Sequence, residues 1–258
     1  MKILITNDDG IRAPGLEILA NWARKLGTVT VVAPKSEQSA KSHSINIRTP
    51  FEVQKVSWLE GIDCYSVDSA PADCIRFAYN GLNRDTNDRF DLVLSGINKG
   101  LNVGEDIAYS GTDAAIFEAA YFKCRAIAFS TVPETFEWAE KCLDKCYDYI
   151  IDNNYFDFNL LYNVNIPANP KDEILLTRQG NAYFKDIFVE TEPGMYKASG
   201  YSIYKGTANL EEDLDAVMNS YISITPLSVN RTAMGAYEKL KKGSQASKKS
   251  VSIATSKV

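Results

Sequence analysis

Two adjacent aspartates near the start of the chain, Asp8 and Asp9 in the stretch NDDG, are the residues best suited to chemistry. They follow the aliphatic run Ile3–Ile5, which is typical of a central strand buried on both faces. Ligands of open α/β sheets bind beyond the carboxyl ends of the strands, so two carboxylates there are well placed to hold a hard cation. The pair could instead build an Asx turn that caps the next helix, and the pair alone leaves both interpretations open.

Three other polar segments are expected at the same edge. Ser36–Ser44 and Ser95–Gly104 each follow a predicted strand, and Ser110–Thr112 opens a predicted helix. A parallel sheet brings these segments together with the NDDG turn. Oxygen atoms dominate the resulting set of ligands, which suits Mg²⁺ or Mn²⁺ better than zinc. The only histidine, His43, lies in the first of these loops.

A phosphate group bound at this edge would need hydrogen-bond donors and positive charge. The amides that open the helix at Gly111 and Thr112 supply donors, and the helix dipole adds to them. Lys99 could add charge, although a solvated lysine is an equally good interpretation. His43 could protonate a leaving alkoxide, donate to the phosphate or be an incidental loop residue, because a histidine side chain can gain or lose a proton near neutral pH.

The elements that would position these residues begin with a strand, a helix and a second strand, which predicts a parallel sheet with right-handed crossovers. The second strand is Thr28–Ala33, and further strands are predicted at Cys64–Val67, Asp91–Leu94, Arg125–Thr131, Leu161–Ile166 and Tyr221–Pro226. Helices are predicted at Leu16–Leu26, Pro71–Tyr79, from Ser110 onward, at Glu134–Ile151 and at Glu212–Met218. Ile45–Val56 alternates like a strand around Pro50 and is expected to form an edge hairpin with Cys64–Val67.

The chain is expected to form a single α/β domain over residues 1–240. Residues 167–219 contain short aromatic runs separated by Gly and Pro, which predict β-hairpins leaving the main sheet. Such an excursion suits an oligomer contact or a wall over the site, or a satellite core. Residues 241–258 carry five lysines and no acid, which predicts a mobile basic tail.

Composition limits the functional classes. The 258 residues are 45% hydrophobic with a net charge of −5, so nothing points to stable nucleic-acid binding or to an anionic membrane surface. The five cysteines show no paired CxxC spacing, which favours buried, reduced thiols. No charged start followed by an apolar segment and no run of about 18 apolar residues is present, so we expect a cytoplasmic protein without membrane attachment.

Several long motifs in order, NDDGIRAPG, APKSEQSAKSHSI, SAPADC, SGINKGLNVGEDIAYSGT and YISITPL, resemble those of the SurE family of survival-protein nucleotidases. The resemblance covers most of residues 1–230. It implies a Rossmann-like three-layer sandwich, a C-terminal β-hairpin excursion involved in oligomerisation, a homodimer or homotetramer, and one Mg²⁺ or Mn²⁺ ion per subunit. The implied activity is hydrolysis of nucleoside 5′- and 3′-monophosphates.

Position by position, the resemblance assigns roles to individual residues. The implied metal ligands are Asp8, Asp9, Ser39 and Asn98, and the implied phosphate-binding segment is Ser110, Gly111 and Thr112. From the residues themselves, Asn7 and Lys99 are further candidate phosphate-binding residues, and Asp8, Asp9 and His43 are the candidate catalytic residues. Two positions depart from the family pattern. Ser42 stands where glycine is usual, which bears on whether the loop can adopt a positive φ. Asp113 stands where a small or apolar residue is common, which adds charge near an expected anion.

Two other functional classes place an acidic pair after the first strand. A phospho-accepting signalling module would need an acceptor aspartate at the end of a central strand, where this chain has Ser95 and Asn98. A covalent aspartyl phosphatase usually has an acid two residues after its nucleophile, and that position is Gly10 if Asp8 attacks. We therefore favour direct attack by water activated by the metal.

Overall fold

The computed structural model describes residues 1–84, 89–206 and 208–242. Contacts divide the chain into two units, Met1–Leu227 and Ser228–Val258. The first unit contains the sheet and all of the candidate site residues. In the second unit, residues 234–242 are helical. Of the predicted tail, residues 241 and 242 belong to that helix, and the remainder lies outside the described residues.

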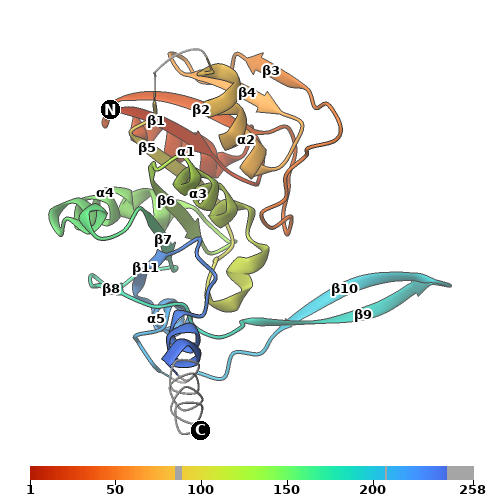
Figure 1. Ribbon diagram of the computed structural model, residues 1–258, viewed down its shortest axis with the longest axis vertical. Helices are drawn as coiled ribbons and strands as arrows, with labels where there is room; N and C mark the ends of the chain where they lie inside the picture. Colours follow the sequence, from red (N-terminus) through yellow and green to blue (C-terminus); the bar gives the residue numbers. More distant parts are fainter. Residues whose placement is uncertain (85–88, 207, 243–258) are drawn as a thin grey trace, which may run out of the picture. The chain divides into compact units, whose positions relative to one another are not determined.

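A mostly parallel sheet forms the centre of the first unit. Its strands are β1 (Lys2–Thr6), β2 (Thr28–Pro34), β3 (Val53–Val56), β4 (Asp63–Val67), β5 (Leu92–Lys99), β6 (Arg125–Thr131), β7 (Leu161–Ile166), β8 (Ile174–Leu176) and β11 (Ile222–Leu227). In the described part of the chain the sheet has nine strands in the order β3-β4-β2-β1-β5-β6-β7-β11-β8 (Figure 1). The six strands from β4 to β7 are parallel to one another, whereas β3 and β11 are antiparallel to β4 and β7.

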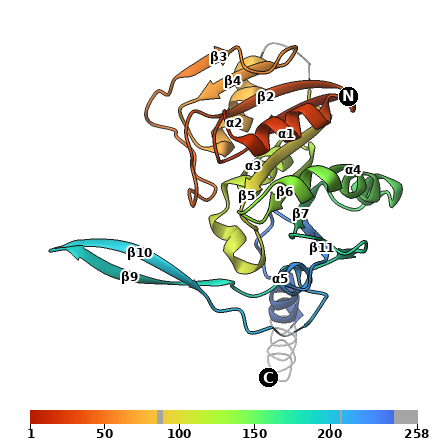
Figure 2. The same ribbon diagram turned by 180° about the vertical axis from the view of Figure 1, so that it is seen from behind.

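Helices cover both faces of this sheet, as the two opposite views show (Figures 1 and 2). They are α1 (Pro14–Ala23), α2 (Pro71–Phe77), α3 (Gly111–Tyr121), α4 (Glu137–Asp152) and α5 (Asp213–Met218), with the π-helix η1 (Ala78–Leu82) and the 3-10 helices η2 (Gly104–Tyr109) and η3 (Tyr155–Asp157). Ile3 and Ile5 belong to the core formed with α1 and α4, and Leu4 belongs to the core formed with α2 and α3. This alternation explains the uninterrupted aliphatic run of β1 and confirms the three-layer α/β fold.

The strand order places a topological switch point between β1 and β5. The chain adds β2 and β4 on one side of β1 and then returns to add β5 and β6 on the other side. Crossovers on the two sides leave a crevice at the carboxyl ends of β1 and β5, which is where open α/β sheets bind ligands. The NDDG turn follows β1, and Asn98 lies near the end of β5.

Two segments differ from the sequence expectation. Ser95–Lys99, expected as a loop, continues β5, with a register irregularity against β6 between Ser95 and Asn98. The edge hairpin is confirmed for β3 and β4, but residues 45–52 are not a strand. There the Asn46 carboxamide accepts hydrogen bonds from the amide and hydroxyl of Thr49, a local turn that competes with strand pairing.

The predicted excursion contains a separate antiparallel hairpin of β9 (Phe184–Glu192) and β10 (Met195–Ser202), in which every residue is exposed. Figures 1 and 2 show it extending away from the central sheet. All five cysteines are free thiols, and four of them are buried, as the sequence predicted. Among the helices of the described residues, none has the length and hydrophobicity needed to cross a membrane.

Candidate active site

The NDDG turn is held together by Asn7. Its side-chain oxygen accepts a hydrogen bond from the Gly10 amide at 3.2 Å, and its side-chain nitrogen donates to the Gly10 carbonyl at 3.1 Å. Gly10 has φ +105°, a conformation that side chains rarely adopt. The following helix α1 has Ala13 at its N-cap and no side-chain capping bond. The aspartates therefore do not cap α1, and Asn7, a predicted phosphate-binding residue, uses its side chain to shape the turn.

Asp8 is buried against the first turn of α3. The Thr112 hydroxyl donates to its Oδ1 at 2.6 Å, and a Cβ placed on Gly111 would lie 2.8 Å from the Asp8 Cβ. Glycine is therefore required at position 111 by this close approach. Burial raises the pKa of Asp8, while hydrogen bonds from Thr112 and the backbone of Asp8 and Gly111 act in the opposite direction. The aspartate turn and the helix start thus form one connected structure.

Asp9 is half-buried beside Asp8, and its Oδ2 accepts a hydrogen bond from the Lys99 backbone amide at 3.2 Å. This bond joins the end of β1 to the end of β5. Burial raises the pKa of Asp9 to about 6, with further contributions from the charges of Asp8 and Glu37. Lys99, predicted to contribute its ammonium group to phosphate binding, contributes its backbone amide to Asp9.

The loop after β2 brings a third acid to the site. The Gln38 amide donates to the Asp8 carbonyl at 2.7 Å, and the Ser39 hydroxyl donates to Glu37 Oε1 at 2.7 Å. Because the Ser39 hydroxyl donates its hydrogen bond to Glu37, the lone pairs of the Ser39 oxygen remain to accept a hydrogen bond or to bind a metal ion. Our sequence reasoning did not identify Glu37. Its only signal was an acid two residues before Ser39 in a loop rich in hydroxyl groups.

Asn98 lies at the irregular end of β5 and is partly buried. Its side-chain nitrogen donates to the Gly100 carbonyl at 2.8 Å. The side-chain oxygen of Asn98 is therefore the atom that remains to bind a metal ion. In sequence, Asn98 directly precedes Lys99, whose amide contacts Asp9. The four predicted metal ligands therefore lie on the NDDG turn and on two segments hydrogen-bonded directly to it.

This donor set fits a divalent cation. The pKa values of Asp8 and Asp9 are both raised, mainly by burial, and neighbouring negative charges add to the rise at Asp9. Holding both carboxylates ionised therefore costs free energy, and a bound cation would offset that cost. The described residues contain no group of three or more His, Cys, Asp or Glu side chains arranged around a metal position. Two carboxylates with neutral oxygens match Mg²⁺ or Mn²⁺, which are bound through few carboxylates together with waters and substrate phosphates.

The structure places His43 against the middle of α3. Its Nε2 lies 2.8 Å from Glu118 Oε2, and Glu118 also faces the Arg76 side chain at 3.7 Å. Arg76 in turn pairs with Asp73 at 3.0 Å. Glu118 is seven residues after Gly111, or about 10 Å farther along the helix at 1.5 Å per residue. His43 thus belongs to a charged network about 10 Å along α3 from the predicted phosphate-binding segment. Sequence reasoning missed the other members of that network.

Ser42, the first departure from the family pattern, adopts the positive φ that glycine usually provides at this position. Its φ is +53°, in the left-handed region that favours glycine. The Ser42 amide donates to the Tyr109 carbonyl at 3.0 Å, and its hydroxyl donates to the Ala108 carbonyl at 2.6 Å. These two bonds fix the loop to η2, so the serine gains a hydrogen bond that glycine could not make.

Asp113, the second departure, lies in the first turn of α3 and is completely buried. Neither of its carboxyl oxygens has a hydrogen-bond partner among the described residues. Burial raises the pKa of Asp113 to about 8, opposed by the Ser110 side chain and reinforced by the charges of Asp8 and Asp213. At neutral pH the side chain is therefore mostly protonated and adds little negative charge near the predicted phosphate position.

Ser110 is the N-cap of α3. Its side-chain oxygen accepts from the Asp113 amide at 3.0 Å, and its carbonyl accepts from the Ala114 amide at 3.2 Å. The sequence predicted a helix beginning here, and the structure confirms it. Ser110 engages these two amides and the Gly111 amide donates to the Asp8 carboxylate, so the Thr112 amide is the first-turn donor that remains for a ligand among the described residues.

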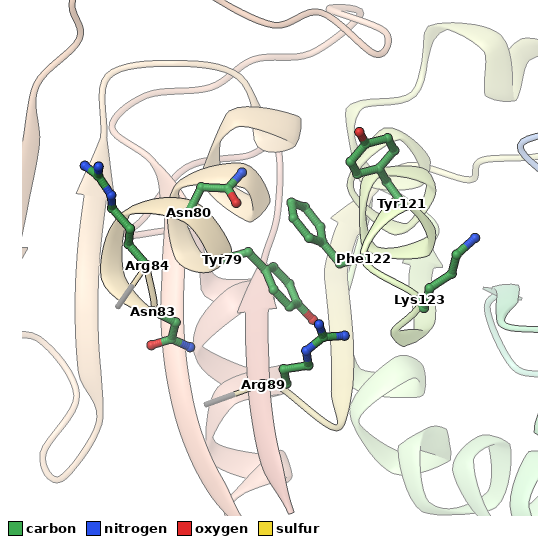
Figure 3. A pocket seen from close by; sticks show the side chains of 8 residues that line it. All are labelled: Tyr79, Asn80, Asn83, Arg84, Arg89, Tyr121, Phe122 and Lys123. Atoms are coloured by element: carbon green, nitrogen blue, oxygen red, sulfur yellow. The ribbon is translucent and has the colours of Figure 1, made fainter. Parts of the chain in front are cut away.

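A separate pocket of about 390 Å³ lies at the amino-terminal edge of the sheet (Figure 3). It is lined by residues that precede β5 and by the C-terminal end of α3, including Tyr79, Arg89 and Phe122. The Tyr79 and Phe122 rings stack with centroids 4.2 Å apart. None of the predicted site residues lines this pocket, because they lie at the carboxyl ends of the strands.

The comparisons with known proteins agree with this geometry. The family profile described as "Survival protein SurE" matches residues 3–186. The chain is 38% identical to "5'-nucleotidase SurE" of Clostridium beijerinckii over 251 residues, covering 90% of this chain and 94% of the relative. It is 35% identical to the protein of the same name from Petrotoga mobilis, covering 93% and 98%.

Among solved structures, the SurE protein from Aquifex aeolicus superposes with a TM-score of 0.79 at 32% identity, covering 94% of this chain and 99% of that one. The family match over residues 3–186 includes the aspartate turn after β1, the loop after β2, the end of β5 and the start of α3. The chain therefore belongs to the SurE family.

Proposed function

We propose that this chain is a divalent-metal-dependent nucleotidase that hydrolyses nucleoside 5′- and 3′-monophosphates to nucleoside and phosphate. The observation that carries the proposal is the direct connection of the Asp8–Asp9 turn to the N-terminus of α3, through Thr112 and the close approach of Gly111. A carboxylate pair for a cation and a helix start for an anion then lie side by side. The names of the relatives from Clostridium and Petrotoga support the substrate class.

The residues that would hold the cation, one Mg²⁺ or Mn²⁺ per subunit, are Asp8, Asp9, Ser39 and Asn98. When bound, such an ion polarises a phosphoryl oxygen and acidifies a water molecule. Thr112 fixes Asp8 from the buried side, while Lys99 fixes Asp9 from the side of β5. These hydrogen bonds hold the two carboxylates in a defined arrangement.

The phosphate group would be bound at the start of α3 by the Thr112 amide, next to Gly111, whose own amide donates to Asp8. The helix dipole would contribute about 0.3 to 1 kcal/mol. Asp9 is the more exposed carboxylate of the pair and would therefore be the more accessible of the two to water. His43 is the candidate donor to the leaving oxygen, and its bond to Glu118 orients the ring. His43 contacts Glu118, about 10 Å along α3 from Gly111. Its proton would therefore reach the leaving oxygen through a movement of the loop, a bridging water or a long leaving group.

The two alternative classes fit the geometry less well. A signalling module needs an acceptor aspartate at the end of the central strand, and β5 ends in Asn98 and Lys99. A covalent aspartyl phosphatase needs a second acid two residues after Asp8, where Gly10 adopts φ +105°. Direct attack by water is therefore the reaction that the residues support best.

The distal half of the β9–β10 hairpin supplies a surface for a homodimer or homotetramer. Phe188, Met195 and Tyr196 are 71%, 61% and 62% exposed on it, and an exposed strand edge with large apolar side chains tends to pair with another chain. A cytoplasmic location fits the five reduced cysteines.

A phosphate-release screen tests the proposed function. Nucleoside 5′- and 3′-monophosphates, sugar phosphates and short polyphosphate are compared in the presence of Mg²⁺, Mn²⁺ or EDTA. We expect the highest kcat/KM with nucleoside monophosphates and no turnover in EDTA. Preference for a substrate without a nucleoside would overturn the assigned substrate class.

A further inference from the structure

A cleft of about 710 Å³ lies between η2 and the base of the β9–β10 hairpin. The yellow-green segment that contains η2 is close to the start of this hairpin in both views (Figures 1 and 2). Its lining includes Glu105 and Tyr109 from η2, and Phe184, Lys185 and Asp186 from β9. A volume of this size is in the range of small-molecule sites, roughly 300 to 1,000 Å³.

The two walls of this cleft are joined by Asp106. Its Oδ2 accepts hydrogen bonds from the backbone amides of Tyr183 at 2.8 Å and Phe184 at 2.9 Å. The hairpin base is therefore fixed to η2 by a carboxylate rather than resting against it. Gly104, at the start of η2, approaches the backbone so closely that an added Cβ would lie 2.0 Å from the Asn181 carbonyl oxygen.

Tyr109 connects the cleft with the phosphate-binding segment. It immediately precedes Ser110, and its Cα is at most about 7.6 Å from that of Gly111, because consecutive Cα atoms are 3.8 Å apart. Its side chain is 63% exposed. Its backbone carbonyl accepts the Ser42 amide, which holds the backbone in place. Phe184, on the opposite wall, is 49% exposed.

The chemistry of the lining suits a nucleoside and disfavours further phosphate groups. Tyr109 and Phe184 offer flat faces on which a heteroaromatic base can stack. Glu105, Asp106 and Asp186 outnumber Lys185, so the cleft is acidic. The exposed carboxylates of Glu105 and Asp186 can accept hydrogen bonds from ribose hydroxyls and exocyclic amino groups, and they repel additional anions.

We propose that this cleft binds the nucleoside part of the substrate, with Tyr109 as the principal stacking residue and Phe184 on the facing wall. The inference rests on the proposed function, because it assumes that the phosphate group lies at the start of α3. It adds the location of the base and the residues that recognise it. It also predicts that monophosphates are preferred over nucleoside diphosphates and triphosphates.

The test compares a nucleoside 5′-monophosphate with ribose 5-phosphate, which has the same phosphate and sugar but no base. Tyr109→Ala should lower the ratio of the two kcat/KM values by roughly 5- to 100-fold, the range expected for losing one base–aromatic stack. Tyr109→Phe keeps the ring and should keep the ratio. Tyr121→Ala is the matched control, because Tyr121 is 78% exposed at the opposite end of α3.

Calorimetric titration of the free nucleoside in EDTA provides a readout without catalysis. The wild-type protein should bind the nucleoside, and Tyr109→Ala and Phe184→Ala should each weaken this binding, while Tyr121→Ala should not. Unchanged binding and an unchanged kcat/KM ratio in Tyr109→Ala would overturn the proposed cleft. Nucleoside binding that depends on Tyr109, without phosphate release from any substrate, would instead refute the proposed function.

Discussion

Replacing Asp113 by asparagine should stabilise the protein increasingly as the pH rises. Asp113 is completely buried, without a hydrogen-bond partner for either oxygen among the described residues, and its pKa is raised from 3.8 to about 8. The folded state therefore retains a proton that the unfolded state loses. Stability contributed by the protonated carboxyl is fully present below pH 3.8 and is lost as the pH rises through about 8.

The magnitude follows from one proton. Between the two pKa values, the wild-type free energy of unfolding should fall by about 1.4 kcal/mol per pH unit because of this group. Asparagine cannot titrate, so the difference between Asp113→Asn and wild type should increase by about 2.8 kcal/mol from pH 5 to pH 7. Other titrating groups, including Asp8 and Asp9, contribute to both proteins and largely cancel in the difference.

Urea unfolding at pH 5, 6 and 7 in EDTA, monitored by far-UV circular dichroism, measures this difference. Asp113→Ala serves as a second variant. It adds a cavity cost that does not change with pH, so the pH dependence of its unfolding free energy should match that of Asp113→Asn. Equal slopes for the wild type and both variants would mean that Asp113 titrates near its ordinary pKa. The assignment of a neutral carboxyl in the first turn of α3 would then be wrong.

Substitutions at four further positions test the site. Gly111→Ala adds a Cβ 2.8 Å from the Asp8 Cβ, so we expect a loss of about 1 to 3 kcal/mol in urea unfolding together with weaker metal binding, although alanine favours helices; unchanged stability would contradict the close approach. Ser42→Ala should lower stability by about 1 kcal/mol by removing its hydroxyl bond while keeping φ +53°. Ser42→Gly should cost less because it relieves the backbone, and the reverse order in thermal melts would refute this. Glu118→Gln and His43→Ala should each lower kcat for a nucleoside monophosphate more than for an aryl phosphate, and their double variant should be non-additive; additive losses would separate the two residues.

The sequence was sufficient to predict the central sheet, since strands such as β1 and β6 are continuous apolar runs covered on both faces. It also predicted the convergence of the NDDG turn, the loop after β2 and the start of α3, because the carboxyl ends of parallel strands share an edge. Continuation of β5 through Asn98 was not predictable, because Gly96 and Gly100 resemble a loop until pairing with β6 is known.

Long-range side-chain partners were beyond sequence reasoning for a physical reason. Glu118 is separated from His43 by 75 residues, and no local pattern encodes that pairing. The role of Asn7 depends on both atoms of its carboxamide facing Gly10. The burial of Asp113 could not be read from its position in a helix first turn, where acids are common and usually exposed.

The central claim is that Asp8 and Asp9 hold a divalent cation that is needed to remove phosphate from nucleoside monophosphates. The most direct measurement is phosphate release from one such substrate by the wild type, Asp9→Asn and the control Asp152→Asn, whose site is exposed at the end of α4. Each protein is assayed in EDTA and after addition of Mg²⁺ or Mn²⁺. We predict that activity of the wild type and of the control is lost in EDTA and restored by either ion. Asp9→Asn should be slower by orders of magnitude, with a melting temperature in EDTA no lower than that of the wild type, because the substitution removes a destabilising charge. Full activity in EDTA, rescue by zinc alone, or wild-type turnover by Asp9→Asn would contradict the account.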